Sequence, residues 1–158
     1  ASAGGTPLRE RVGHSLIKAR MRREEAVFGG ELSGHYYFRH NHYSDSAVIA
    51  VFHMLDLLSR SDQPLSVLID PLRRYPSTGE VNFEVADKDA AIEAIAERFA
   101  DGEIDRLDGI TVVYPDWWFN VRKSNTEPLL RLNLEGDTPE IMEAGRRRVL
   151  EVLGSPEA

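Results

Sequence analysis

The sequence predicts a mixed α/β and α+β protein, in which an α/β layer is followed by a small four-stranded, mainly antiparallel sheet with two helices on one face. Three observations lead to this prediction. Residues 48–58 carry apolar side chains at helical spacing, residues 81–85 and 129–134 alternate apolar and polar side chains, and residues 70–78 are rich in proline and polar side chains. We therefore expect a first domain over residues 1–69, a linker over 70–78 and a second domain over 79–158.

The first domain is expected to alternate short strands with helices. Residues 6–13 read as a short strand that runs into a turn, and Ser15 is suited to cap the helix after it. Residues 26–28 form a brief apolar run that stops at two glycines, which is typical of a short strand. The apolar stripe further on predicts a helix capped by Ser44 or Asp45, and a short helical turn should follow the next proline.

The second domain is expected to run in the order β-α-β-β-β-α. The strand at residues 81–85 should be followed by a helix, because apolar residues then recur at four-residue steps. That helix is expected to close near Gly102 in the left-handed conformation. Residues 101–106 carry three acidic side chains around the apolar Ile104, and we interpret them as a helix end and a solvated turn.

The remaining strands and the last helix have clear boundaries in the sequence. Two β-rich runs, residues 110–114 and 117–122, are joined by a Pro-Asp pair that suits the centre of a tight turn, so a hairpin is expected. The alternating run at 129–134 gives one more strand. Thr138 followed by proline marks the start of the last helix, and Gly154 marks its end.

The composition excludes several classes of function. The 26 acidic and 19 basic residues give a net charge of −7, which argues against a nucleic-acid or anionic-membrane partner. The absence of cysteine excludes disulfides, thiolate catalysis and cysteine zinc sites. The longest apolar run, residues 47–52, is far shorter than the roughly 20 residues of a membrane span, and no export signal opens the chain. We expect a soluble, cytoplasmic protein.

The run at residues 122–128 has the parts of a phosphate-binding loop. Arg122 offers a planar fork for two phosphate oxygens, Ser124 and Thr126 offer hydroxyls, and Asn125 tolerates a left-handed backbone that aims successive amides inward. Glu127 would repel a phosphate, so we expect it to point away, toward Arg131. The alternative is a polar hairpin loop with an incidental arginine, since serine, asparagine and threonine are ordinary turn residues.

Two further segments are candidates for binding. In the glycine-flanked loop at residues 29–35, Glu31, Ser33 and His35 combine an acceptor, a hydroxyl and an imidazole, which is a mixture that suits sugar hydroxyls. A solvated glycine turn explains the same spacing. Arg11 and His14 should stand at the N-terminus of the first helix, where an anion can bind, although basic residues at a solvated helix start are equally common.

The histidines of the first domain do not predict a metal site. The histidines at positions 35, 40 and 42, with Asp45 nearby, have some resemblance to a ligand set. Nothing in the sequence fixes the position of a third ligand, and a histidine-rich surface loop explains the same residues. No residue of this chain is therefore assigned to a metal.

Taken together, the segments at residues 11–15, 29–35 and 122–128 resemble the α-D-phosphohexomutases, and most closely the bacterial phosphomannomutase/phosphoglucomutases. The resemblance covers nearly the whole chain, and the second and third segments jointly are highly specific. It implies a four-domain enzyme that moves a phosphoryl group between O1 and O6 of a hexose. The implied reaction passes through a phosphoserine and a bisphosphate intermediate that turns over in the site.

The resemblance also implies roles for the candidate residues. Glu31 and Ser33 would bind the O3 and O4 hydroxyls of the sugar, with His35 beside them as a candidate for proton transfer or hydroxyl binding. Because mannose and glucose differ at C2, a loop that reads O3 and O4 accepts both. Arg11, where the family often has lysine, and His14 would lie near the substrate. The residues implied to hold the phosphate that is not reacting are Arg122, Ser124, Asn125 and Thr126.

The sequence departs from the family pattern in two places. It has no Ser-His-Asn-Pro type nucleophile loop and no Asp-x-Asp-x-Asp loop for Mg²⁺. The resemblance therefore implies a truncated third domain followed by the fourth, with Mg²⁺ bound by an absent upstream domain and none by this chain. The expected partners are a mannose or glucose 1- or 6-phosphate and those upstream domains. Lys123 and Asn125 favour the hexose enzymes over phosphoglucosamine mutases, and a non-catalytic phosphosugar-binding or interaction domain is the remaining alternative.

Overall fold

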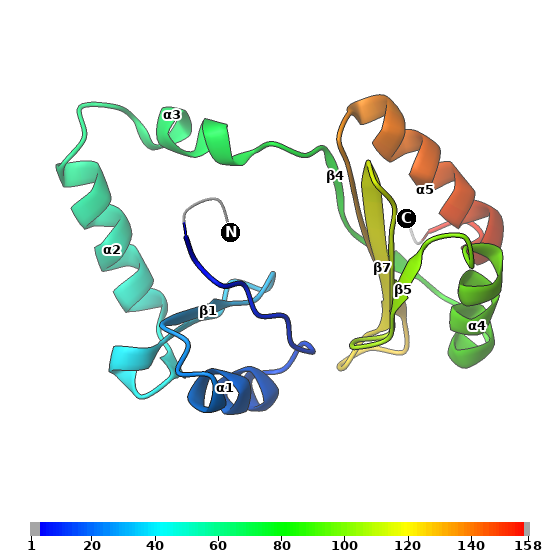
Figure 1. Cartoon of the computed structure of the whole chain (residues 1–158), viewed down its shortest axis with the longest axis horizontal. Coiled ribbons are helices and arrows are strands. Elements are labelled where there is room, and N and C mark those ends of the chain that lie inside the picture. Colours follow the sequence, from blue (N-terminus) through cyan, green and yellow to red (C-terminus); the bar gives the residue numbers. More distant parts are fainter. Residues whose placement is uncertain (1–3, 157–158) are drawn as a thin grey trace. The chain divides into compact units, whose positions relative to one another are not determined.

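The computed structural model describes residues 4–156 and divides into two compact units, Ala1–Asp70 and Pro71–Ala158. Each unit has its own small sheet and its own helices (Figure 1).

The first unit contains a three-stranded antiparallel sheet in the order β1-β2-β3. Its strands are β1 (Phe28–Gly30), β2 (Tyr36–Phe38) and β3 (Ser44–Asp45). Its helices are α1 (His14–Arg23), α2 (Ala47–Ser59) and α3 (Leu65–Ile69), with short 3-10 turns η1 (Arg39–Asn41) and η2 (Asp70–Leu72), the second of which crosses into the next unit. Tyr37 and Phe38 of the central strand are buried, as is Met21 of α1, so the core of this unit lies where α1 meets the sheet.

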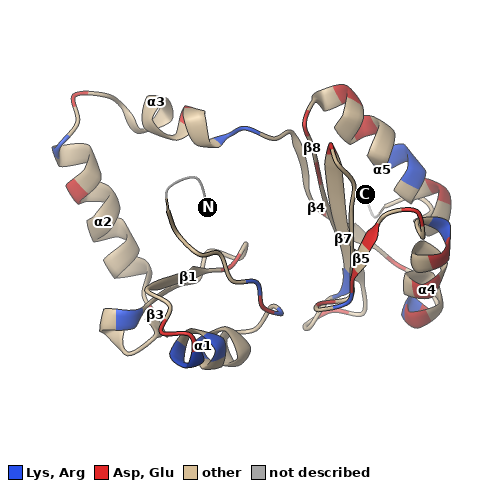
Figure 2. Cartoon of the chain, in the orientation of Figure 1, with Lys and Arg blue, Asp and Glu red and all other residues tan. Residues whose placement is uncertain are grey.

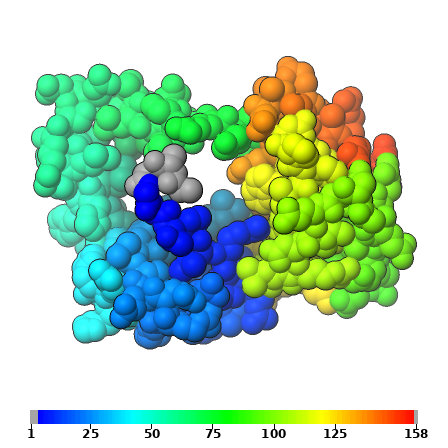
Figure 3. Space-filling model, viewed as in Figure 1, coloured from blue at the N-terminus to red at the C-terminus, as the bar shows by residue number. Residues whose placement is uncertain are grey.

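The start of the first unit differs from the prediction. Residues 6–13 form no strand. They are mostly exposed, and they belong to the dark blue segment at the surface in Figure 3. Helix α1 begins at His14, so Ser15 lies inside the helix and does not cap it. The residue before the helix is Gly13, whose φ of 139° lies in a range that L side chains rarely adopt. A glycine therefore makes the turn that was assigned to a serine cap.

The cap of α2 also differs from the prediction. Ser46 is the N-cap residue, and its hydroxyl oxygen accepts a hydrogen bond of 3.2 Å from the Ile49 backbone amide. Ser44 and Asp45 form β3 instead, where they pair with Phe38 and Tyr37 of β2. The predicted helix and the short helical turn after Pro64 are both present.

The second unit is a five-stranded antiparallel sheet in the order β4-β8-β7-β6-β5, with two helices on one face (Figure 1). Its strands are β4 (Ser77–Phe83), β5 (Glu103–Asp105), β6 (Ile110–Val113), β7 (Trp117–Lys123) and β8 (Leu130–Gly136), and its helices are α4 (Lys88–Arg98) and α5 (Pro139–Leu153). The core between sheet and helices is built from apolar residues of every layer, including Phe83, Ile95, Phe99, Phe119, Leu132 and Val149. The α+β class is as predicted.

One strand of this sheet was missed, which makes five strands where four were expected. Residues 103–105, interpreted from the sequence as part of a solvated turn, form β5 and pair with β6. The helix before them ends at Arg98, earlier than expected, and Gly102 has no left-handed conformation. Glycine is required at 102 for space, because a Cβ there would come within 2.5 Å of a methyl carbon of Val112.

The strand predicted at residues 81–85 begins and ends earlier, as β4 at Ser77–Phe83, whereas the predicted hairpin and the two ends of the last helix agree with the structure. The hairpin pairs β6 with β7, and the Tyr114 amide donates to the Trp117 carbonyl across the turn at 2.9 Å. The Thr138 hydroxyl accepts from the Ile141 amide at 3.3 Å and so caps α5. Gly154 follows the last residue of α5 with a φ of 83°. The threonine and the glycine thus bound the helix, as the sequence indicated.

The two faces of the second sheet differ in polarity because strand side chains alternate. On β8, Leu130, Leu132 and Leu134 are fully buried beneath the helices. Arg131, Asn133 and Glu135 alternate with these leucines and therefore project from the opposite face. A row of polar and charged side chains thus leads along this face to the loop after β7, where Figure 2 shows blue basic residues at the strand end.

Helix α2 is largely uncharged along its length (Figure 2) and buries none of its residues. Phe52, for example, is 66% exposed. Within residues 4–156, no helix has both the length and the apolar character needed to cross a membrane.

Candidate functional site

The loop that joins β7 to β8 is ordered by one serine. The Ser124 amide donates to the Leu129 carbonyl at 2.9 Å and closes the loop. The Ser124 hydroxyl oxygen accepts from the amides of Thr126 (3.4 Å) and Glu127 (3.2 Å), and it lies 3.5 Å from the Thr126 hydroxyl. Asn125 does not have a positive φ, so the left-handed backbone predicted at this residue is wrong. The loop is shaped by a serine side-chain turn instead.

Arg122 stands at the entrance of this loop with only 10% of its side chain exposed. Its Nη2 donates to Oε2 of Glu80 at 3.0 Å, and its Nη1 lies 3.5 Å from the Lys123 carbonyl oxygen. Gly109, in the turn before β6, lies so close to β7 that a Cβ at this position would come within 2.7 Å of the Arg122 Cα. The guanidinium is therefore held in place by a carboxylate from another strand, and five donor N–H groups make it suitable for binding phosphate oxygens.

Glu80 also binds a second arginine. Arg122 and Arg131 are direct partners in the register between β7 and β8, and Arg131 Nη1 lies 3.1 Å from Oε1 of Glu80. Arg131 Nη2 donates to Glu127 Oε2 at 2.5 Å, which confirms the prediction that Glu127 turns toward Arg131. Two like charges on facing strands repel each other, and the carboxylate between them offsets that repulsion. The result is a connected row of two arginines and two glutamates beside the loop.

The loop between β1 and β2 is a tight turn. The Glu31 amide donates to the His35 carbonyl at 2.9 Å, and the Gly34 amide donates to the Glu31 carbonyl at 3.0 Å. Gly34 has a φ of 85°, a conformation that favours glycine. Ser33 Oγ and His35 Nδ1 are 2.9 Å apart, so these two side chains share a hydrogen bond on the exposed side of the turn. The structure thus brings the side chains of Ser33 and His35 together.

The carboxylate of Glu31 is fixed by a buried tyrosine. Tyr37 is fully buried in the central strand, and its hydroxyl donates to Glu31 Oε1. Burial, followed by the hydrogen bond to the Glu31 carboxylate, raises the pKa of the Tyr37 phenol well above its ordinary value. The phenol therefore stays protonated and remains a donor to Glu31 over the physiological pH range.

Arg11 and His14 lie where the sequence placed them, around the start of α1. Arg11 is an exposed residue of the preceding segment, and its backbone amide donates to the Glu10 carboxylate at 2.9 Å. His14 is the first residue of the helix, and its side chain is exposed. Gly13 supplies the carbonyl that accepts from the amides of Leu16 and Ile17. Both basic side chains are thus accessible beside a helix N-terminus.

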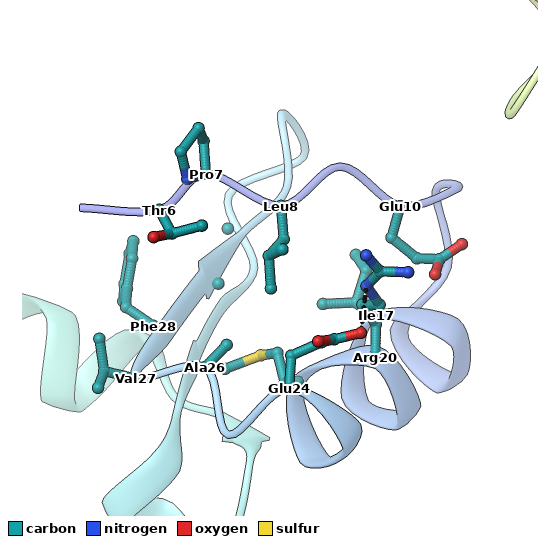
Figure 4. Close-up of a pocket in the computed structure, with 13 residues that line it drawn as sticks. Thr6, Pro7, Leu8, Glu10, Ile17, Arg20, Glu24, Ala26, Val27 and Phe28 are labelled. Atoms are coloured by element: carbon teal, nitrogen blue, oxygen red, sulfur yellow. Dashed lines mark ion pairs between the residues drawn. The ribbon is translucent and has the colours of Figure 1, made fainter. Parts of the chain in front are cut away.

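A groove of about 650 Å³ lies between α1, β1 and the segment around residues 6–10 (Figure 4). The Leu8 side chain points into it, and Phe28 lies across from Thr6 and Pro7. Arg20 and Glu24 on its helical side form an ion pair of 3.5 Å. Because these two charges already bind each other and most of the lining is apolar, the groove lacks the convergent donors of a phosphate site.

The histidines of the first unit form ring contacts. His40 packs 5.5 Å from the Phe38 ring and 6.1 Å from the His53 ring, measured between centroids. Within residues 4–156, no group of three histidine, aspartate or glutamate side chains is arranged to hold a metal ion. These described residues therefore contain no cluster suited to the Mg²⁺ that the family resemblance implies.

Comparison with known families identifies the class of protein. A model described as phosphoglucomutase/phosphomannomutase, alpha/beta/alpha domain III, matches residues 1–75. A second, described as phosphoglucomutase/phosphomannomutase, C-terminal domain, matches residues 80–152. The chain therefore belongs to the phosphoglucomutase/phosphomannomutase family. Within that family it corresponds to domain III followed by the C-terminal domain.

Individual relatives agree with this assignment. A phosphomannomutase of Salmonella montevideo is 43% identical over 159 residues, covering 98% of this chain and 35% of the relative. One of Methanocaldococcus jannaschii is 39% identical, covering 98% and 34%. A crystal structure of a phosphoglucomutase/phosphomannomutase family protein from Burkholderia thailandensis has a TM-score of 0.79 and 31% identity, covering 99% of this chain and 35% of that one. This chain thus spans about a third of the length of these relatives.

Two residues that contact the candidate site, Tyr37 and Glu80, were not singled out from the sequence. Tyr37 binds Glu31, while Glu80 binds both Arg122 and Arg131. The alternation of polar and apolar residues in β4 and β8 placed Glu80 and Arg131 on polar positions. It gave no information on which strands are neighbours, so the contact itself was not predictable.

Proposed function

We propose that this chain is the C-terminal part of a phosphohexomutase, which interconverts hexose 1-phosphates and 6-phosphates, and that it supplies recognition of the sugar phosphate. The observation that carries the proposal is the nearly buried guanidinium of Arg122, held beside a loop whose backbone is ordered by Ser124. An arginine fixed in this way has lost most of its conformational freedom before the ligand arrives, which lowers the entropic cost of binding.

At the phosphate end, Arg122 contributes the charge, and Ser124, Asn125 and Thr126 line the turn. Charge-assisted hydrogen bonds to a phosphate dianion are about twice as strong as neutral ones, so Arg122 dominates the interaction. The proposed ligand group is the phosphate that does not react. Its binding orients the hexose, so that the other end of the sugar meets the catalytic groups.

At the sugar end, we assign Glu31 and Ser33 to the O3 and O4 hydroxyls. A carboxylate oxygen already fixed by Tyr37 is oriented to accept from a sugar hydroxyl at its other positions. His35, hydrogen-bonded to Ser33, is the candidate for proton transfer. A loop that binds the O3 and O4 hydroxyls makes no contact with the hydroxyl at C2, so both mannose and glucose phosphates are accepted. Arg11 and His14 are proposed to line the same substrate.

The phosphoserine and the Mg²⁺ are proposed to lie in other domains of the same enzyme, which acts in the cytoplasm. Two observations support this division. The sequence contains neither family loop for these groups, and this chain spans only about 35% of a typical relative. The chain by itself is therefore expected to show no mutase turnover with glucose 1,6-bisphosphate as activator, in a coupled assay of glucose 6-phosphate formation. Robust turnover by the isolated chain would contradict this part of the proposal.

The phosphate role is tested by Arg122→Ala in the full-length protein that carries this chain. Loss of a charged transition-state contact is expected to reduce kcat/KM by about 2 to 4 kcal/mol, or ~30-fold to ~1000-fold. Arg106→Ala is a control, because Arg106 also binds a carboxylate in the same unit, that of Glu93, but does so on the surface. Unchanged kcat/KM in Arg122→Ala refutes the role.

A further inference from the structure

Glu80 forms the centre of a row of charges beside the proposed phosphate loop. Its two carboxylate oxygens are divided between two arginines, with Oε2 at 3.0 Å from Arg122 Nη2 and Oε1 at 3.1 Å from Arg131 Nη1. Arg131 is held in turn by Glu127, a residue of the loop itself. The row therefore connects β4, β7, β8 and the loop through side chains alone.

The arrangement leaves Arg122 little freedom. Its side chain is 10% exposed, that of Arg131 is 21% exposed and that of Glu80 is 27% exposed, so water screens these contacts less than it screens surface pairs. Arg122 and Arg131 face each other in the strand register, where two positive charges without a counter-charge would move apart. Removing the Glu80 carboxylate would thus take away the counter-charge that the two guanidiniums share, and Arg131 would keep Glu127 as a partner.

A carboxylate near a phosphate site has an obvious cost. Its negative charge repels the ligand, so a simple electrostatic view predicts that phosphate binding improves when Glu80 is neutralised. The geometry favours the opposite result, weaker binding when Glu80 is neutralised. Displacing a binding group such as a guanidinium by about 1 Å can slow an enzyme about 100-fold through misalignment alone.

We propose that Glu80 is a positioning residue for substrate binding: it fixes the guanidinium of Arg122 toward the phosphate loop, and Arg131 locks Glu80 in the orientation that allows this. This inference rests on the proposed function, since it gives Glu80 an effect only through the binding of phosphate by Arg122. Glu80 itself touches no substrate.

The experiment measures steady-state kinetics with mannose 1-phosphate or glucose 1-phosphate in the full-length protein, for Glu80→Ala, Glu80→Gln and the control Glu93→Ala. Glu93 binds Arg106 bidentately on the surface of the same unit, so its loss removes an arginine partner away from the loop. Glu80→Ala is expected to raise KM by about 10-fold to 100-fold with a much smaller change in kcat. Glu80→Gln keeps one acceptor for one arginine and should show an intermediate rise, whereas Glu93→Ala should leave both constants unchanged.

The decisive comparison combines Glu80→Ala with Arg122→Ala. If Glu80 acts through Arg122, the double variant has the same KM as Arg122→Ala alone, because the residue that Glu80 positions is already gone. Additive effects overturn the inference, and so does a lower or unchanged KM in Glu80→Gln. Melting temperatures of all variants identify any that fail to fold, and Glu80→Gln, which preserves size, keeps the comparison valid if Glu80→Ala is unstable.

The same set of variants separates this inference from the proposed function. If Arg122→Ala has no effect on KM or kcat/KM, the proposed phosphate role fails. If Arg122→Ala is impaired while Glu80→Ala is normal, the phosphate role stands and only the positioning role of Glu80 is wrong.

Discussion

The hydroxyl of Tyr37, a fully buried residue of the central strand β2, donates a hydrogen bond to the carboxylate of Glu31 in the adjacent turn. This contact links the core of the first unit directly to the loop proposed to bind sugar hydroxyls. The position of the Glu31 carboxylate therefore depends on a residue that has no access to the ligand.

Tyr37→Phe is expected to lower the free energy of unfolding of the first unit by about 0.5 to 1.5 kcal/mol, since it removes one hydrogen bond and little volume. It should also raise KM for the hexose phosphate, because Glu31 is no longer oriented. Chemical denaturation and steady-state kinetics measure the two effects. Tyr36→Phe is the control, since Tyr36 lies next to Tyr37 on the same strand but is exposed. Identical results for the two variants would contradict a special role of Tyr37.

The raised pKa of Tyr37 predicts a pH dependence of stability. The folded protein holds the phenolic proton more tightly than the unfolded chain, whose tyrosine has an ordinary pKa near 10.0. The stabilisation is therefore fully present below about pH 10 and is lost progressively as the pH rises above that value. Denaturation of the parent chain and Tyr37→Phe at neutral and high pH should show that the parent loses more stability. Equal losses would contradict the prediction.

Gly109→Ala is expected to disrupt the strand that carries Arg122. Gly109 has a φ of 65°, and a Cβ would come within 2.3 Å of the Val121 carbonyl oxygen and 2.8 Å of the Arg122 Cβ. Gly79 provides a matched control, because it has the same φ of 65° but nothing within 4 Å of a Cβ. Gly79→Ala should cost about 1 kcal/mol from the left-handed backbone alone, and Gly109→Ala about 2 kcal/mol more. Equal melting temperatures for the two variants would show that the contact with β7 is unimportant.

Ser124→Ala is expected to loosen the phosphate loop without unfolding the unit. The serine oxygen accepts from two loop amides, and removing an acceptor of this kind costs about 1 kcal/mol. We expect a rise in KM for the hexose phosphate with a small fall in melting temperature. Thr138→Ala removes a similar capping acceptor at α5 and should lower the melting temperature comparably while leaving KM unchanged. A normal KM in Ser124→Ala would argue against a preformed loop.

Gly145→Ala tests the packing of α5 on the sheet. A Cβ at this position would come within 2.5 Å of the Trp117 ring, which cannot yield as a flexible side chain does. Overpacking costs about 1 to 3 kcal/mol, which exceeds the roughly 1 kcal/mol that alanine gains over glycine in a helix. A net loss of stability is expected in thermal denaturation, and a stabilised variant would contradict it.

Local chemistry explains which parts of the fold were predictable. The Thr138 cap, the Pro-Asp hairpin turn and the alternating leucines of β8 are set by residues close together in the sequence, and each agrees with the structure. Strand β5 was missed because its three residues, Glu103–Asp105, hold one apolar side chain between two acidic ones, which is too short a run to show a repeat. It is a strand because β6 offers a partner, and a neighbouring strand is not visible in a local pattern.

The same distinction applies to the candidate site. The side chains proposed to bind a sugar phosphate, Arg122, Ser124 and Glu31 among them, could be proposed from the sequence because their hydrogen-bonding groups are fixed by residue type. The backbone expected at Asn125 was wrong, since a serine hydroxyl shapes that turn.

The sequence by itself determined the residue types of the two loops, the two ends of α5 at Thr138 and Gly154, and the membership of a phosphohexomutase family. Only the tertiary structure decided that Glu80 lies between Arg122 and Arg131 and that Tyr37 binds Glu31. Helix capping and the alternation of polar and apolar residues depend on residues that are close together in the sequence, so both can be recognised from the sequence. The Glu80 contact joins residues 42 positions apart, and it exists only because β4, β8 and β7 lie side by side in that order.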